Sequence, residues 1–188
     1  MKKSRTQKML QTKRLALSRW QMFWHFSVVP FILITPIMSA IAIFQIEVSG
    51  AYSGVRTTNE HFNMGWPWLI PAALFAVIQY RRLSLKKVEV SLTAEEFKKS
   101  VKEVGRKLGW QVECLTNDLM IAKTGFTWAS WGERITVIRE RDFLLINSIC
   151  DPDSRPSISS WGRNRKNINA LVTAIKPAPN TGSCKNGG

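Results

Sequence analysis

The basic run at 163–167 is the stretch of this sequence best suited to binding chemistry. The apolar residues that follow it recur at i, i+3, i+4 and i+7, which predicts a helix: Ile168, Leu171, Val172 and Ile175. The first turn of a helix attracts anions through its unpaired backbone amides and the positive end of its dipole, and arginine hydrogen-bonds phosphate well. The candidate anion or lipid site is Arg163, Asn164, Arg165, Lys166 and Asn167. The alternative is a solvated basic corner that pairs with Asp151 or Asp153.

The tripeptide Ser-Trp-Gly occurs twice, at 130–132 and at 160–162. An internal duplication is excluded because a strand pattern follows the first copy and a helix pattern follows the second. Both copies are better explained as structural loops, in which glycine lets the chain turn and tryptophan buries a large apolar area. The structural loop residues are Trp131, Gly132, Trp161 and Gly162.

The residues needed for common enzyme chemistry are sparse. The sequence has two histidines, His25 and His61, and neither belongs to the C-terminal half. Ser-His and Cys-His nucleophile pairs are therefore not expected there, and neither are most transition-metal sites. The three cysteines, at 114, 150 and 184, show no disulfide or metal-binding spacing. We expect no catalytic residue, no metal site and no cofactor.

Two apolar stretches predict membrane helices. Residues 26–46 are almost wholly apolar, and at 1.5 Å per residue they span roughly 31 Å, about the thickness of the hydrocarbon core. Residues 62–80 form a second uncharged stretch near the short limit for a span, so a buried hairpin is the alternative there. We expect two transmembrane helices over 24–80 with an outer loop at 47–65.

The excess positive charge is concentrated beside these stretches. The chain has 27 Lys and Arg against 13 Asp and Glu, a net charge of +14. The membrane-surface cations are Lys2, Lys3, Arg5, Lys8, Lys13, Arg14, Arg19, Arg81, Arg82, Lys86 and Lys87. Since cytoplasmic flanks carry the excess of Lys and Arg, both termini are predicted to be cytoplasmic. Residues 1–23 are predicted to be a basic amphipathic cytoplasmic N-terminus, whose charge is a topology signal. The alternative is an amphipathic helix that lies on anionic headgroups, and nucleic acid is not expected as a partner.

The C-terminal half predicts an α+β domain. Residues 87–92 alternate as a strand does, Thr93 and Glu96 form a capping box, and an apolar stripe continues to Leu108. Four strand patterns with short connections follow, and then the helix near 168–175. The predicted order is β-α-β-β-β-β-α with an antiparallel sheet over 88–175, after a basic linker at 81–87 and before a disordered tail at 176–188.

Several of these positions together resemble a family. SWGE-x-I-T at 130–136, the strand that contains Ser148, and WG-x-N-x-x-N-I at 161–168 resemble a poorly characterised cytosolic α+β domain. That domain occurs in small bacterial membrane proteins of the Bacteroidetes type, sometimes beside rhomboid-like segments. The likeness covers about 90–175 and implies no activity. No rhomboid catalytic motif is present in the two spans.

We therefore predict a multi-pass protein of the bacterial inner membrane whose cytoplasmic domain binds rather than catalyses. An accessory or regulatory role with a protein partner is favoured, and a homo-oligomer is possible. The alternative is a sensor of anionic lipid or of a phosphorylated small ligand through 163–167. An enzyme subunit ranks third.

Overall fold

The computed structural model describes residues 2–125, 132–153 and 163–175. These residues form two compact units. One unit contains the helices of the two apolar stretches, and the other contains the N-terminal helix, the strands and the last two helices. Trp131, Trp161, Gly162 and the tail at 176–188 lie outside the described residues.

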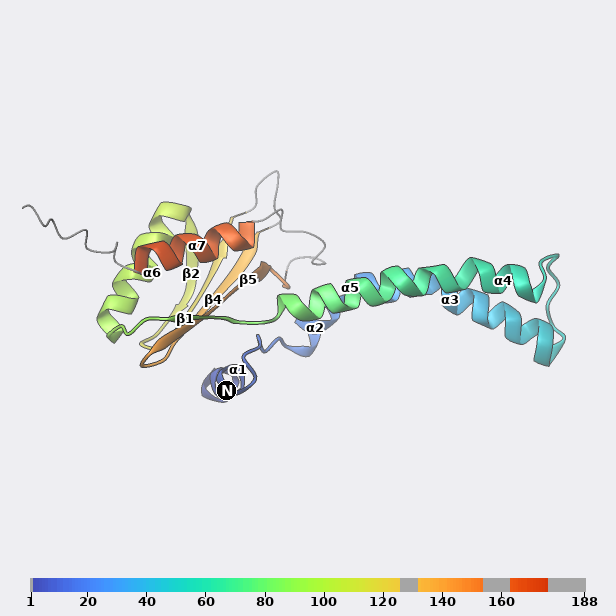
Figure 1. The fold of residues 1–188 in the computed structure, drawn as a ribbon, viewed down its shortest axis with the longest axis horizontal. Helices are drawn as coiled ribbons and strands as arrows, with labels where there is room; N and C mark the ends of the chain where they lie inside the picture. The colour runs from blue at the N-terminus through green and yellow to red at the C-terminus, as the bar shows by residue number, and fades with distance from the viewer. Residues whose placement is uncertain (1, 126–131, 154–162, 176–188) are drawn as a thin grey trace, which may run out of the picture. The chain divides into compact units, whose positions relative to one another are not determined.

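The first unit is a pair of long helical segments (Figure 1). Its elements are α2 (Arg19–Phe26), α3 (Val28–Phe44), a π-helical turn (Gln45–Ser49), α4 (Thr58–Gly65), a 3₁₀ turn (Trp66–Trp68) and α5 (Leu69–Arg82). The continuous segments Val28–Ser49 and Thr58–Arg82 are long and apolar enough to cross a membrane, judged by length and composition. The connection between them, 50–57, is shorter than the expected loop at 47–65, because a capping box of Thr57 and Glu60 starts α4 early.

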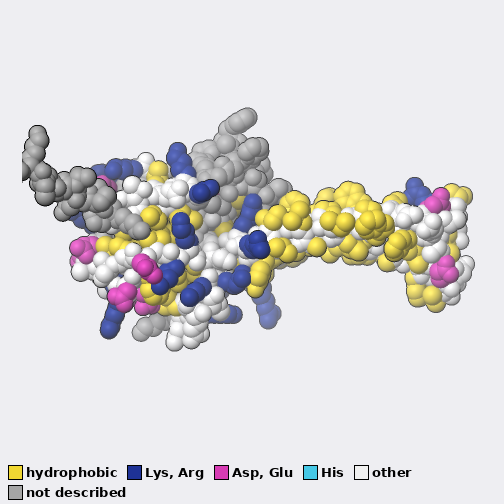
Figure 2. Space-filling view, in the orientation of Figure 1, with side chains coloured by type: hydrophobic (Ala, Val, Ile, Leu, Met, Phe, Trp, Pro, Cys, Tyr) yellow, Lys and Arg dark blue, Asp and Glu magenta, His cyan; other side chains and the backbone are white. Residues whose placement is uncertain are grey.

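Large apolar side chains cover the outside of both segments. Figure 2 shows hydrophobic side chains along most of the surface of the paired helices. The exposed ones include Phe31, Ile34, Ile37, Met38, Ile41 and Phe44 on α3, and Phe62, Trp66, Leu69, Ile70, Leu74 and Val77 on the other segment. A continuous apolar surface of this kind is unusual on a water-soluble monomer.

Small residues let the two segments approach closely. A Cβ atom added to Gly65 would lie 2.8 Å from the Cβ of Ser39 and 3.3 Å from the Cα of Pro36. Ser39, Ala42 and Ala72 are also buried. Helices in lipid gain their contacts by packing through small side chains of this type.

The second unit is built on an antiparallel sheet with the strand order β1-β5-β4-β3-β2. Its elements are α1 (Lys2–Thr12), β1 (Lys86–Glu89), α6 (Ala94–Leu108), β2 (Trp110–Leu115), β3 (Leu119–Thr124), β4 (Glu133–Arg139), β5 (Phe143–Cys150) and α7 (Arg163–Ile175). Lys86 and Lys87 are therefore strand residues, and the basic linker expected at 81–87 is divided between the end of α5 and the start of β1.

The main core lies between the sheet and helices α6 and α7. Phe97, Val101 and Val104 of α6 and Leu171 of α7 pack there with strand residues such as Val137. The predicted capping box is confirmed: the Thr93 hydroxyl accepts from the Glu96 amide, and the Glu96 carboxylate accepts from the Thr93 amide. The helix ends at Gly109, whose φ of +66° is a conformation that glycine adopts without strain.

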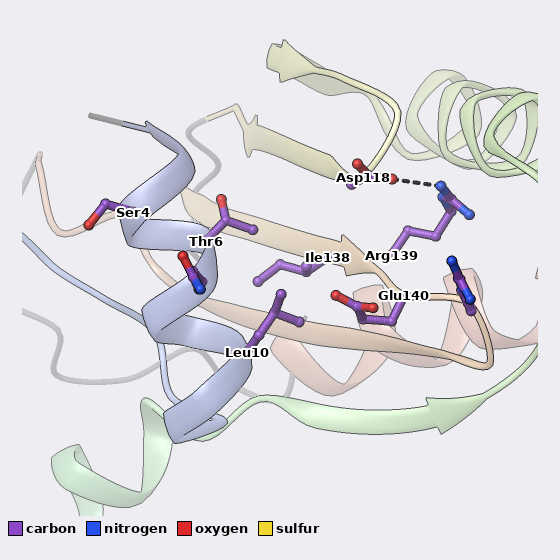
Figure 3. A pocket seen from close by; sticks show the side chains of 9 residues that line it. Ser4, Thr6, Leu10, Asp118, Ile138, Arg139 and Glu140 are labelled. Atoms are coloured by element: carbon purple, nitrogen blue, oxygen red, sulfur yellow. Dashed lines mark hydrogen bonds and ion pairs between the residues drawn. The ribbon is translucent and has the colours of Figure 1, made fainter.

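The opposite face of the sheet is also buried. Side chains alternate along a strand, so Ile138 and Leu145 face away from the main core, yet each is at most 1% exposed. Helix α1 lies on this side, with Leu10 directed toward Ile138 (Figure 3). Met9 and Leu15, two apolar residues of the N-terminal segment, are buried within the protein. The N-terminal segment therefore contributes buried apolar side chains to the protein, and its amphipathic cytoplasmic role stays a prediction.

Replacing Thr93 with Ala should lower the free energy of unfolding by about 1 kcal/mol, because α6 loses the acceptor for its N-terminal amide. The fall should be visible as faster hydrogen exchange in the first turns of α6. Thr116→Ala, at a turn outside any helix, is the comparison that leaves α6 exchange unchanged. Unaltered α6 protection in Thr93→Ala would contradict this account.

Candidate binding site

A buried polar cluster joins β4, β5 and α7. Glu133, which follows Gly132 at the start of β4, is fully buried, and its Oε2 accepts a short hydrogen bond from the Asn167 carboxamide of α7. The Ser148 hydroxyl of β5 donates to the same oxygen at 3.4 Å. Glu133 follows the first motif and Asn167 follows the second, so residues 34 positions apart meet. A buried carboxylate requires such donors, because leaving it unpaired in the protein interior is costly.

The backbone before Glu133 makes this contact possible. Gly132 has a φ of +92°, and a Cβ there would lie 3.1 Å from the Thr124 carbonyl oxygen. The Gly132 carbonyl accepts from the Asp151 amide at 3.1 Å, and the Glu133 amide donates to the Thr124 hydroxyl at 2.9 Å. Gly132 therefore has a backbone conformation and a close backbone contact that favour glycine.

An ion-pair network lies on the other side of the same strand ends. Lys123 contacts Glu113 and Asp151 at 3.0 Å each, and Arg134 lies 3.9 Å from Glu113. Burial by itself lowers the pKa of Lys123, but its hydrogen bonds with the two carboxylates outweigh this, so the pKa lies above its ordinary value. Asp151 thus pairs with Lys123, a partner that the sequence did not suggest.

The residues of the predicted anion site divide in the structure. Asn167 turns inward to Glu133, whereas Arg165 and Lys166 are exposed. The side chains of Arg163 and Asn164 lie outside the described part of the chain. Only Arg165 and Lys166 are therefore seen in a position to meet a solvent-side anion, and Asn167 has a structural role.

A groove with a volume of about 680 Å³ lies between α1 and the sheet (Figure 3). Ser4, Thr6, Gln7 and Leu10 line one wall. Asp118, Ile138, Arg139, Glu140 and Arg141 line the other. Its volume is in the range of sites that hold a drug-sized ligand or a few residues of peptide.

Arg139 fixes the strand wall of this groove. Its guanidinium donates to the carbonyl oxygens of Asn117 at 2.8 Å and Leu92 at 3.0 Å, and to the Asp118 carboxylate at 2.6 Å. Arg139 is the last residue of β4, and Asn117 and Asp118 form the connection between β2 and β3. Its hydrogen bonds therefore link the end of β4 to that connection. The groove therefore has a fixed polar rim beside the apolar floor of Leu10 and Ile138.

Sequence reasoning did not find this groove. The sequence did indicate that both faces of the sheet are covered, because apolar residues occupy both alternating sets of positions along β4 and β5. This pattern did not indicate which segment of the chain packs on the second face. The basic charge of 1–19 favoured contact of that segment with lipid headgroups rather than with the sheet. Among the described residues, no three His, Cys, Asp or Glu side chains gather closely enough to hold a metal ion.

Comparison with known proteins adds no further assignment: no family model, curated protein or solved structure matches the chain. The resemblance of 90–175 to the domain of small bacterial membrane proteins stays a prediction. The structure brings together Glu133, Ser148 and Asn167, three of the residues that carry it.

Asn167→Leu should lower the free energy of unfolding by about 1–3 kcal/mol, since the buried Glu133 carboxylate loses its amide donor. Lys166→Leu, at the exposed neighbouring position, should change it by no more than about 0.5 kcal/mol. Urea titration of the full chain in detergent, followed by near-ultraviolet circular dichroism, measures both. Equal stability of the two variants would show that the Glu133–Asn167 bond contributes little.

Proposed function

We propose that this protein is an accessory or regulatory protein of the bacterial inner membrane. Segments Val28–Ser49 and Thr58–Arg82 anchor it as a two-helix hairpin, and its α+β domain binds a segment of a protein partner. The observation that carries the anchoring is the apolar surface around both segments, which water would solvate poorly and a bilayer would match.

The charge distribution supports an orientation with both termini in the cytoplasm. The residues up to 19 carry seven Lys and Arg and no acid, and Arg81 and Arg82 end the second segment. At the opposite ends of the two segments, Glu47 of the first and Glu60 of the second outnumber Arg56 of the connection. The positive-inside rule then places the α+β domain on the cytoplasmic side.

The groove between α1 and the sheet is the proposed site for the partner. It offers an apolar floor, hydroxyl and amide groups from α1, and charges of both signs from the β4–β5 turn. A peptide has the same mixture of apolar side chains and backbone donors and acceptors. Peptide recognition commonly combines an apolar contact with main-chain hydrogen bonds in this manner.

Gln7→Trp should fill the groove and abolish recovery of a stoichiometric partner when the full chain is purified from membranes in mild detergent. Gln11→Trp is the matched control, because Gln11 is exposed on the same helix and does not line the groove. Mass spectrometry of the purified material measures the partner. Partner recovery that survives Gln7→Trp would move the binding site elsewhere, and extraction of the chain by carbonate would overturn the anchoring.

Exposure of Arg165 and Lys166 favours a second candidate function, sensing of an anionic lipid or phosphorylated ligand. In nanodiscs that contain phosphatidylglycerol, hydrogen exchange at the start of α7 should be slower than in phosphatidylcholine nanodiscs. Arg165→Ala combined with Lys166→Ala should remove that difference, whereas Lys99→Ala combined with Lys102→Ala on α6 should not. Equal exchange in both lipids would exclude the lipid form of this function.

A further inference from the structure

Helix α1 is held against the sheet by few side chains. Of the side chains described in residues 4–12, only Met9 is buried, and Thr6 and Leu10 are half-buried. Leu10 lines the groove opposite Ile138 (Figure 3). Because hydrophobic stabilisation is proportional to the apolar area that is buried, the contact between α1 and the sheet is a weak one.

The charges of α1 do not stabilise the helix. Its first turn contains Lys2 and Lys3 and no acidic residue, although the positive end of the helix dipole lies there. Residues 2–12 include four Lys and Arg and no Asp or Glu, and Arg5 and Lys8 are exposed. An isolated helix of 11 residues is also marginal in water, so α1 requires an apolar surface to pack on.

The backbone directly after α1 is strained. Lys13 has a φ of +52°, a left-handed conformation that residues with a Cβ atom seldom adopt. The Lys13 carbonyl accepts a hydrogen bond from the Leu85 amide at 2.9 Å, which holds the chain at this point. The sheet-bound position of α1 thus includes a backbone conformation that a released helix does not need.

A bilayer with anionic headgroups offers α1 a competing surface. Its basic residues are attracted to the headgroups, and Met9 and Leu10 can enter the boundary between headgroups and acyl chains. The same two side chains are buried or half-buried in the protein, so α1 cannot use both surfaces at once. The link 13–18 joins α1 to α2, and six extended residues reach about 20 Å, so the proposed anchor keeps α1 near the bilayer.

We propose that α1 is a reversible wall of the partner groove, which leaves the sheet when it binds an anionic membrane surface. Ser4, Gln7 and Leu10 line the groove, so release of α1 removes one wall and exposes Ile138. A partner bound between α1 and the sheet favours the docked helix, whereas anionic lipid favours the released helix. The two ligands therefore oppose each other, and linkage makes this effect reciprocal. The inference rests on the membrane anchoring and on the partner site proposed above.

The test is hydroxyl-radical labelling of Ile138 in the full chain, measured by peptide mass spectrometry. Ile138 has no exposed surface while α1 is docked, so its labelling follows the released fraction. In nanodiscs that contain phosphatidylglycerol, this labelling should be roughly tenfold higher than in phosphatidylcholine nanodiscs. Val137, the neighbouring residue of β4, belongs to the core with α6 and α7 and should stay unlabelled in both lipids.

Arg5→Ala combined with Lys8→Ala should return the labelling of Ile138 in phosphatidylglycerol to its level in phosphatidylcholine, because two exposed cations of α1 are lost. Lys99→Ala combined with Lys102→Ala is the matched control, since both lysines are exposed on α6, and it should leave the increase unchanged. Inorganic phosphate added to phosphatidylcholine nanodiscs should produce no increase, because a free ion offers no apolar layer to the side chains of α1.

Equal labelling of Ile138 in both lipids would overturn this inference and leave the partner site intact, since the measurement requires no partner. An increase that the α6 variant also removes, or that phosphate alone reproduces, would overturn it as well. Labelling of Val137 that rises together with that of Ile138 would mean that the sheet unfolds, and would exclude release of α1 alone. Extraction of the chain by carbonate would instead refute the anchoring.

Discussion

The α+β unit depends on covering a sheet that is apolar on both faces. Val137 and Ile138 are adjacent in β4, point to opposite sides, and are both fully buried. Helices α6 and α7 cover one side through a shared core. The other side needs a cover from elsewhere in the chain, and α1, far from the strands in sequence, lies over the part of it beside Ile138. Burial of this surface is the dominant favourable term for the unit.

This constraint also explains the groove. A single helix of 11 residues is narrower than a five-stranded sheet, so it covers part of a face and leaves a recess beside itself. Arg139 lines this recess, and its guanidinium is held by three hydrogen bonds to Asn117, Asp118 and Leu92. The same helix that completes the fold therefore forms one wall of the proposed partner site.

Both units contain buried polar side chains at places where helices pack against their neighbours. In the α+β unit, Asn167 and Ser148 meet the buried Glu133 carboxylate and fix the position of α7 on the sheet. In the helical pair, the Ser39 hydroxyl and the His61 Nδ1 have no such partner in the described structure. The Oε2 atom of Glu133 is thus paired within the chain, whereas the two polar atoms of the helical pair make no such bond among the described residues.

The sequence by itself determined the local elements. Apolar runs of bilayer length, the Thr93–Glu96 cap, the i, i+4, i+7 stripe of α6 and the alternating strands each depend on residues near one another, so pattern and propensity are sufficient. The two apolar helices and an antiparallel sheet with helices were predictable for that reason. Tertiary structure alone decided that α1 lies against the sheet beside Ile138, that Asn167 turns to Glu133, and that Asp151 pairs with Lys123. These contacts join residues distant in sequence, and for each residue the sequence offers several possible partners of the same charge or polarity. The actual partner depends on burial and hydrogen-bond geometry, which are properties of the whole folded unit.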